Sequence, residues 1–285
     1  MPETHDPTRH PGFRRYWAEM SARTFSELDC SRLVALLPVG AVEQHGPHLP
    51  VGVDTFLNDG IVSHMVGRLA PQSPLVVLPT LPIGKSDEHL AFAGTLTLDS
   101  ETLRQVWTAI GEGVARTGVR RLILFNSHGG QPQVAEIVAR DLRVRFGMLV
   151  VVASTYGLRQ STGEMFGQAE RDHGIHGGAV ETSMMLHLQP DQVDTAHVQD
   201  FTSAAAALAA SNRHLRFEGR VSVGWMAQDL NPLGAMGDAR LADGEKGRRL
   251  IDETARALAE LVDETARFPL EMLRNKAAWP VADTD

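Results

Sequence analysis

The stretch Glu43-Gln44-His45-Gly46-Pro47-His48-Leu49-Pro50-Val51-Gly52-Val53-Asp54 follows an apolar run, residues 33–39, that is typical of a buried strand. Within it lie two carboxylates and two imidazoles, and two glycines and two prolines constrain the backbone between them. A turn at Gly46-Pro47 is expected to help bring Glu43 and His45 to one centre. The stretch therefore predicts a ligand-bearing loop at the end of a strand.

The rest of the chain alternates short apolar runs with segments of helical periodicity. Further strands are expected at 75–78, 122–125 and 148–153, and helices are expected at 16–28, from 55, from 99 or 100, from 132, at 179–188, over 200–216 and at 245–268. We expect 156–178 to be irregular and 217–244 to be a glycine-rich loop with one strand at 220–225. This alternation predicts βαβ units and an α/β fold with a mostly parallel sheet. A single domain over 1–285, with a loose arm at 1–15, is expected.

Composition excludes several classes of protein. The chain has 285 residues, of which 43% are hydrophobic and 22% charged, enough for one large domain with its own core. A net charge of -8 without a basic run argues against nucleic acid as a partner. The single cysteine, Cys30, forbids an internal disulfide and fits a reducing compartment. Residues 1–15 lack the apolar core of a signal peptide, and no apolar stretch approaches the ~20 residues that span a bilayer. We therefore expect a cytoplasmic protein without a membrane partner.

A second polar stretch, Asn126-Ser127-His128-Gly129-Gly130, follows the expected strand at 122–125. In parallel sheets, ligand sites lie beyond the carboxyl ends of the strands, so this stretch and the first loop converge on one location. A further acid, Glu181, begins the helix after His176-Gly177-Gly178. The candidate ligands are Glu43, His45, Asp54, His128 and Glu181.

Mixed imidazole and carboxylate ligands suit Zn²⁺, Mn²⁺ or Fe²⁺, and they suit neither the all-oxygen shell of Mg²⁺ nor the thiolate shell of structural zinc. Three carboxylates and two imidazoles exceed the needs of one tetrahedral ion. We therefore predict two divalent metal ions with Asp54 as the bridging ligand. Such a pair can hold a hydroxide and polarise a carbonyl, which serves hydrolysis of an amide or related C–N bond.

Three stretches together resemble the signature of the creatininase (creatinine amidohydrolase) family. They are the first loop, residues 126–130, and His176-Gly177-Gly178-Ala179-Val180-Glu181-Thr182-Ser183. Weaker similarities are Ser86-Asp87-Glu88-His89 with Gly94-Thr95, and Gly237-Asp238 with Gly244-Glu245-Lys246-Gly247. The resemblance covers roughly 30–250. It implies a three-layer α/β/α fold with a mostly parallel sheet, a homohexamer and a dinuclear metal site. It further implies that Glu43, His45, Asp54 and His128 are metal ligands and that His176 donates a proton to the leaving nitrogen.

Two departures bear on the substrate. Creatininases carry a glutamate ligand two residues after the histidine that matches His128, and here that position is Gly130. Other family members with a Gly-Gly version of this motif use the glutamate that matches Glu181, so the resemblance implies Glu181 as the fifth ligand and as a catalytic residue. A first-turn carboxylate favoured by the helix dipole is the competing interpretation. Creatininases also enclose their substrate with tryptophans, and none lies in 156–176. Both departures argue against creatinine itself.

We predict a metal-dependent hydrolase of an amide-type C–N bond in a small, possibly cyclic, substrate. One alternative within the family is trimming of a peptide or formyl group from a larger molecule, or hydrolysis of a cyclic ketone. An alternative of another class is a metal-binding protein without catalysis. Glu88 and His89 either shape the pocket or belong to a solvated loop, His48 is expected to be structural, and His176 could orient a neighbour instead of acting as the acid.

Overall fold

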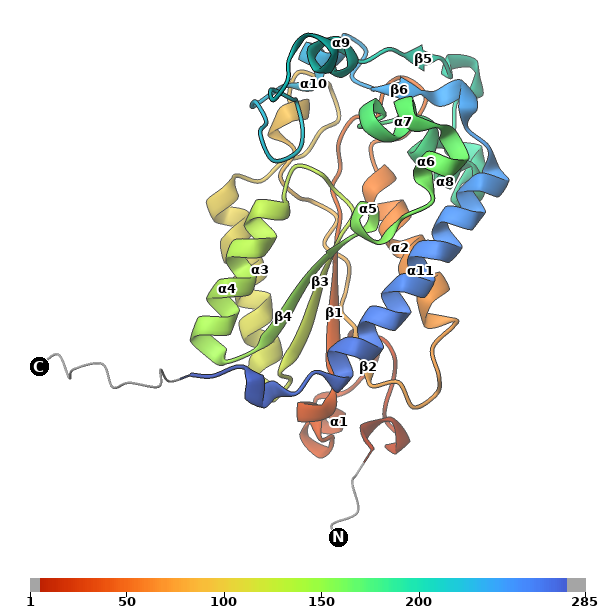
Figure 1. The fold of residues 1–285 in the computed structure, drawn as a ribbon. Coiled ribbons are helices and arrows are strands. Elements are labelled where there is room, and N and C mark those ends of the chain that lie inside the picture. Colours follow the sequence, from red (N-terminus) through yellow and green to blue (C-terminus); the bar gives the residue numbers. More distant parts are fainter. Residues whose placement is uncertain (1–5, 276–285) are drawn as a thin grey trace, which may run out of the picture.

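The apolar runs form one sheet of four parallel strands in the order β2-β1-β3-β4 (Figure 1). The strands are β1 (Val34–Val39), β2 (Leu75–Val77), β3 (Arg121–Asn126) and β4 (Leu149–Ser154). In the register, Val34 of the central strand β1 lies between Leu75 and Arg121. The computed structural model describes residues 6–275. All four expected strands are thus confirmed, each shifted by no more than one residue at either end.

Helices follow the strands as the alternation predicts. Their bounds are α1 (Ala22–Glu27), α2 (Val53–Val66), α3 (Ser100–Arg116), α4 (Pro132–Phe146), α5 (Thr155–Leu158), α6 (Thr162–Phe166), α7 (Gln168–His173), α8 (Ala179–Leu188), α9 (Ala204–Ser211), α10 (Ala227–Leu230) and α11 (Gly244–Arg267). A small antiparallel pair, β5 (Asp200–Phe201) and β6 (Gly237–Asp238), lies beside them. Local signals set several ends: the Asp99 carboxylate caps α3, and Gly147, at a φ of 66°, ends α4.

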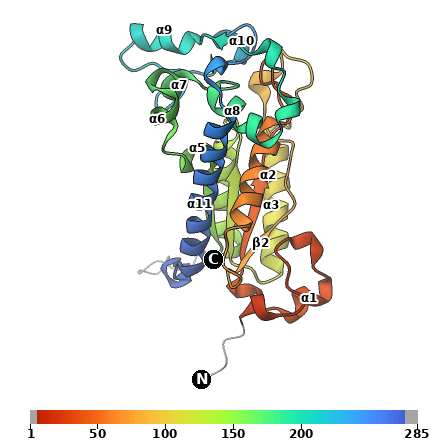
Figure 2. The same cartoon turned by 90° about the vertical axis from the view of Figure 1, so that its right-hand side faces the viewer.

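The molecule has three layers, with the sheet between two groups of helices (Figures 1 and 2). Along β1, Val34 and Leu36 pack into one core with α2, α8 and α11. The alternate residues Ala35 and Leu37 pack into the other core with α3 and α4. Because successive side chains of a strand face opposite sides, a fully buried run such as β1 can supply both cores. The predicted α/β/α fold is confirmed.

Four local expectations are wrong. Residues 6–15 are not loose: Pro7 is buried, and the Arg15 guanidinium donates to backbone carbonyls of Ala70, Pro71, Ser73 and Leu75. The stretch 156–178 is not irregular but holds three short helices, α5 to α7. No strand forms at 220–225, where the only strand-like pairing among the described residues is a single bridge between Arg216 and Ser222. The stretch 200–216 is helical only over α9.

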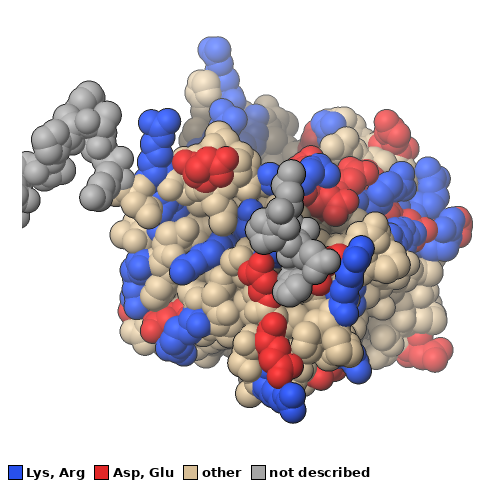
Figure 3. Space-filling view, turned by 90° about the horizontal axis from the view of Figure 1, so that it is seen from below, with Lys and Arg blue, Asp and Glu red and all other residues tan. Residues whose placement is uncertain are grey.

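The carboxyl ends of β1, β3 and β4 point toward the upper part of the molecule in Figure 1, where α7, α9 and α10 lie. The opposite end, seen from below in Figure 3, presents charges of both signs interspersed with uncharged residues. Across residues 6–275, none of the helices combines the length and the apolar character needed to cross a bilayer.

Candidate metal centre

The loop after β1 folds back on itself and buries its polar side chains. Gly46 adopts a φ of 76°, a conformation that side chains disfavour, and a Cβ there would meet the Ala235 methyl at 2.8 Å. The turn predicted at this glycine is therefore present. Glu43 and His45 are 1% and 0% exposed, so both side chains lie inside the protein.

The protein backbone fixes which nitrogen of two imidazoles faces the cluster. His45 Nδ1 lies 3.0 Å from the Glu43 carbonyl oxygen, which can only accept, so Nδ1 carries the proton and Nε2 keeps its lone pair. His128 Nε2 likewise lies 2.6 Å from the Lys85 carbonyl oxygen, leaving Nδ1 to face the Glu43 and Asp54 carboxylates at 3.1 and 3.5 Å. This is how imidazoles that bind metals are usually oriented.

A side-chain clamp holds His128 where β3 ends. Asn126 accepts from the His128 amide at 3.0 Å and donates to its carbonyl at 2.6 Å. Ser127 then donates to the Asp54 carbonyl at 2.8 Å, and Asn58 donates to Ser127 at 3.2 Å. The first turn of α2, which carries Asp54, is thereby tied to the end of β3.

Two groups of three potential ligand atoms share Asp54. Glu43, Asp54 and His128 form one group, and His45, Asp54 and Glu181 form the other, with the ligand atoms of each group within 4.8 Å of one another. The five side chains chosen from the sequence therefore come together from the β1 loop, α2, the end of β3 and α8. The shared Asp54 is the arrangement that a bridging ligand requires.

The cluster leaves polar atoms without partners. Glu43 Oε2, His45 Nε2 and Asp54 Oδ2 are buried and have no hydrogen-bond partner among residues 6–275. Buried polar groups are otherwise paired in folded proteins, so three orphaned ligand atoms converging on one place are an observation that needs a ligand. Divalent cations with mixed nitrogen and oxygen coordination fit this donor set.

The charges of the cluster lead to the same conclusion. Burial, reinforced by the charge of Glu43, raises the pKa of Asp54 well above its usual value. Burial works against a charged His128, but the Glu43 and Asp54 carboxylates outweigh it and raise the pKa of His128 to about 10. The two buried carboxylates thus demand a positive counter-charge, which a metal ion would supply in place of a proton.

Three imidazoles stack beside the cluster. The His176 ring lies between those of His45 and His89, with ring centroids 4.0 and 4.3 Å away. His176 Nε2 donates to the Gln44 carbonyl, so Nδ1 faces the cluster, 3.6 Å from Glu43 Oε1. The stack and the polar cluster are therefore one site.

His89 lies at the candidate metal centre and not in a solvated loop. Of the two interpretations left open for Glu88 and His89, the one in which they shape the pocket therefore holds for His89. It is 1% exposed, and Gln44 Nε2 lies 2.7 Å from its Nδ1. Because the Gln44 amide nitrogen can only donate, His89 Nδ1 accepts and Nε2 holds the proton that points toward Glu43, 3.6 Å away. Burial lowers the pKa of His89 to about 3, so this imidazole is neutral.

The structure explains why position 130 is occupied by glycine. A Cβ at this position would meet the Glu88 carboxylate, His128 Nε2 at 2.5 Å and the Lys85 carbonyl oxygen at 2.7 Å. Glu88 thus fills the space beside His128, with its Oε1 3.7 Å from His128 Nε2, and it lines the cavity. The space that a side chain at this position would need is already taken by a glutamate from the 3-10 helix Asp87–His89.

Replacing Gly130 with alanine is expected to destabilise the fold by about 1–3 kcal/mol, because the backbone of Lys85 must move to admit the Cβ. Gly129→Ala is the matched control, since a Cβ there meets nothing within 4 Å. Chemical denaturation of both variants checks this, and equal stability of the two variants would contradict it.

His48 lies apart from the candidate ligands, as expected from the sequence. Its Nε2 is 2.8 Å from the Thr182 hydroxyl, and its ring stacks on Phe201 with centroids 5.0 Å apart. Glu181, by contrast, projects from the first turn of α8 to the cluster. One of its oxygens accepts from the Gly177 amide at 2.6 Å and lies 3.9 Å from His45 Nε2.

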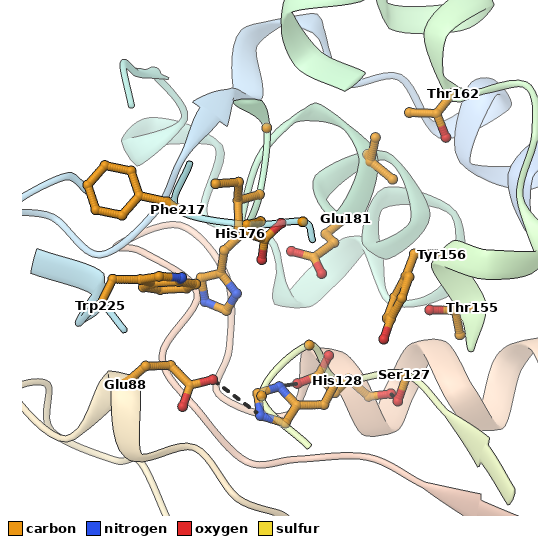
Figure 4. Close-up of a pocket in the computed structure, with 18 of the residues that line it drawn as sticks. Glu88, Ser127, His128, Thr155, Tyr156, Thr162, His176, Glu181, Phe217 and Trp225 are labelled. Atoms are coloured by element: carbon orange, nitrogen blue, oxygen red, sulfur yellow. Dashed lines mark hydrogen bonds and ion pairs between the residues drawn. The ribbon is translucent and has the colours of Figure 1, made fainter. Parts of the chain in front are cut away.

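A cavity of about 700 Å³ opens onto this cluster. Figure 4 shows His128 and Glu88 on one side of it and His176 and Glu181 above, while Trp225 and Phe217 form a wall across from Tyr156. Trp225 and Phe217 were not predicted at the site, because substrate-enclosing tryptophans were expected only in 156–176. Of the other three tryptophans, Trp17 and Trp107 pack in the α3–α4 core, and Trp279 lies outside the described residues.

Comparison with known proteins agrees with this geometry. Residues 18–262 match the family model described as creatinine amidohydrolase. The chain is 32% identical over 240 residues to a mycofactocin precursor peptide peptidase of Mycobacterium ulcerans, covering 82% of this chain and 86% of that protein. It is 32% identical over 203 residues to the creatinine amidohydrolase of Pseudomonas putida, covering 66% and 75% respectively.

A solved structure described as "Creatininase Mn" superposes with a TM-score of 0.72 at 26% identity, covering 90% of this chain and all of that one. The family match spans most of the chain, and the fold and the buried ligand cluster are those on which the sequence resemblance depends. This chain belongs to the creatininase family of hydrolases.

Proposed function

We propose that this chain is a metal-dependent hydrolase that cleaves an amide C–N bond in a peptide or peptide-like substrate. The carrying observation is the pair of ligand groups that share Asp54 at a cavity of about 700 Å³. A small ring compound would fill only part of such a space, whereas drug-sized ligands occupy cavities of roughly 300–1,000 Å³. The similarity to mycofactocin precursor peptide peptidases supports a peptide over the small cyclic substrate expected from the sequence.

Two divalent ions (Mn²⁺, Zn²⁺ or Fe²⁺) would polarise the substrate carbonyl and activate water. Glu43, Asp54 and His128 would hold one ion, and His45, Asp54 and Glu181 would hold the other. The chain's own contribution is to hold these five side chains in place through the backbone contacts described above. It also places the Nδ1 atom of His176 at the cavity wall, facing the cluster.

His176 is the proton donor in this proposal. The departing nitrogen of a cleaved amide must be protonated, because an amide anion is a poor leaving group. Because Nε2 donates its proton to the Gln44 carbonyl, Nδ1 of His176 would take the proton that the attacking water loses and pass it to the departing nitrogen. The rings of His45 and His89 flank the His176 ring and restrict its orientation.

Hydrolysis of a small cyclic amide is the second candidate function. The aromatic wall of Trp225 and Phe217 beside His176 favours it, because flat faces suit a planar ring, and the similarity to a creatinine amidohydrolase supports it.

A panel of short peptides, formamides, ureides and lactams, assayed with chelator and metal-readdition controls, separates these functions. We expect metal-dependent turnover of the peptides. Turnover of lactams alone would favour the second candidate, and no turnover across the panel would support a metal-binding protein without catalysis.

Replacing Glu181 with glutamine is expected to reduce the bound metal from two ions per chain to one. The group of His45, Asp54 and Glu181 then loses a charged ligand, whereas the group of Glu43, Asp54 and His128 stays intact. Metal analysis after dialysis measures this. Glu164→Gln on α6, where the side chain is exposed, is the control. Two ions bound to the Glu181 variant would show that Glu181 is not the fifth ligand.

A further inference from the structure

Arg159, just after α5, has a guanidinium with almost no partners. It lines the same cavity as Glu181 and His176. Its one hydrogen bond to a residue of the described chain goes from Nη1 to the Met184 sulfur at 3.1 Å, and a thioether is a weak acceptor. The Nε atom is buried without a partner, and no ion pair joins this side chain to a carboxylate of residues 6–275.

An arginine held in this way is unusual. Arg159 is half-buried with its Nε fully buried, and a guanidinium removed from water loses hydration that only an acceptor can replace. Burial lowers the pKa of Arg159, although the charges of Glu181 and Glu253 oppose the shift. The site therefore retains a cation whose hydrogen-bonding capacity is unused.

The two carboxylates that influence Arg159 are already engaged. Glu253 of α11 accepts from the backbone amides of Gln160 and Ser161 at 2.9 and 3.2 Å, which fixes the chain directly after Arg159. Glu181 accepts from the Gly177 amide and faces His45. The fold thus anchors the backbone of Arg159 while leaving its guanidinium without a carboxylate partner.

Arg171 shows that this is not a general property of the cavity wall. It lines the same cavity, but its side chain is exposed and its Nε pairs with the Asp172 carboxylate at 3.0 Å. Arg159 and Arg171 therefore provide a matched pair for comparison, one cation without a partner and one with its own.

We propose that Arg159 binds a free carboxylate of the substrate, and that the substrate is a peptide or an N-acylated amino acid with its C-terminal carboxylate near the cleaved bond. The inference rests on the proposed function, which it makes more specific. A planar guanidinium donates two parallel hydrogen bonds to a carboxylate, which gives both affinity and orientation. With the carboxylate held there, the scissile carbonyl extends toward Asp54 and Glu181, because these residues line the same cavity.

The test combines a change in the protein with a change in the substrate. N-acetylated di- and tripeptides are assayed as free acids and as C-terminal carboxamides, with the metal-loaded wild type, Arg159→Met, Arg159→Lys and Arg171→Met. We expect Arg159→Met to lower kcat/KM for the free acids by roughly 10- to 100-fold and to leave the carboxamides within about twofold of wild type. Arg159→Lys should recover part of the loss, and Arg171→Met should leave the preference for the acid unchanged.

An equal loss on acids and carboxamides would overturn the inference, because it would mean that Arg159 acts through the fold or through Glu181. A wild type that does not distinguish acid from carboxamide would overturn it as well. Metal content and circular dichroism of each variant establish that the comparison is made between folded, loaded proteins.

A binding measurement separates this inference from the proposed function. Because the cavity has an aromatic wall, N-acetylphenylalanine and its carboxamide are suitable probes for calorimetry with the metal-loaded protein. Preference for the acid that disappears in Arg159→Met supports the carboxylate site even if no peptide is hydrolysed. Equal affinity for both probes contradicts it even if hydrolysis is observed.

Discussion

Replacing Asp54 with asparagine is expected to remove metal from both positions and to abolish turnover. Asp54 is the one side chain common to both ligand groups. Loss of a residue that merely orients a ligand typically costs about 10- to 100-fold in metal affinity or activity, so loss of a bridging ligand should cost more. Metal analysis after dialysis, together with the peptide assay, measures both effects.

The same variant should behave differently without metal. The Asp54→Asn substitution removes one of two like charges buried beside each other, so the metal-free variant should melt no lower than metal-free wild type. It should also lose the rise in melting temperature that added Mn²⁺ gives the wild type. Asp59→Asn on the same helix is the control, because Asp59 is exposed and its carboxylate only accepts from Thr80. Full metal-induced stabilisation of the Asp54 variant would exclude Asp54 as the bridge.

Replacing His176 with alanine is expected to lower kcat by about 10²- to 10⁴-fold while both metal ions stay bound. His176 is not one of the five candidate ligands, although its ring packs on His45 and its Nε2 donates to the Gln44 carbonyl, and its Nδ1 faces the cavity. A variant with normal metal content and strongly reduced turnover is the outcome expected of a proton donor.

His173→Ala is the control for this prediction, since His173 belongs to α7, three residues earlier, and is not among the residues that line the cavity. Turnover that survives in the His176 variant would show that His176 is not the acid. Loss of one metal ion would instead identify His176 as a ligand, a role that its position near Glu43 and His45 also permits.

The sheet and the convergence of the candidate ligands were predictable for a common reason. The strand β1 is a continuous apolar run that both cores bury, and such runs can be recognised from sequence. The candidate ligands Glu43 and His128 lie in the loops that follow the neighbouring strands β1 and β3, so the parallel sheet brings these loops together. The sheet topology thus sets the approximate position of both side chains, which local contacts then fix.

What could not be predicted depends on contacts between distant segments. Gln44 donates to His89 and to the Gly234 carbonyl, and neither partner is signalled by any local pattern. The helices α5 to α7 are four to six residues long, too short for a helical period to show. Trp225 reaches the cavity from the 217–225 loop, far along the chain from the ligands. Arg159 stands out only because its guanidinium lacks a carboxylate partner among the described residues, and a sequence does not show which side chains are paired.

Anomalous diffraction from a crystal grown with Mn²⁺ would test the central claim most directly. We expect two peaks roughly 3.5–4 Å apart, with an Asp54 oxygen within bonding distance of each. One peak should lie beside Glu43 and His128, and the other beside His45 and Glu181. A single peak, or two peaks of which one lacks Asp54, would contradict the dinuclear centre on which the proposed hydrolysis depends.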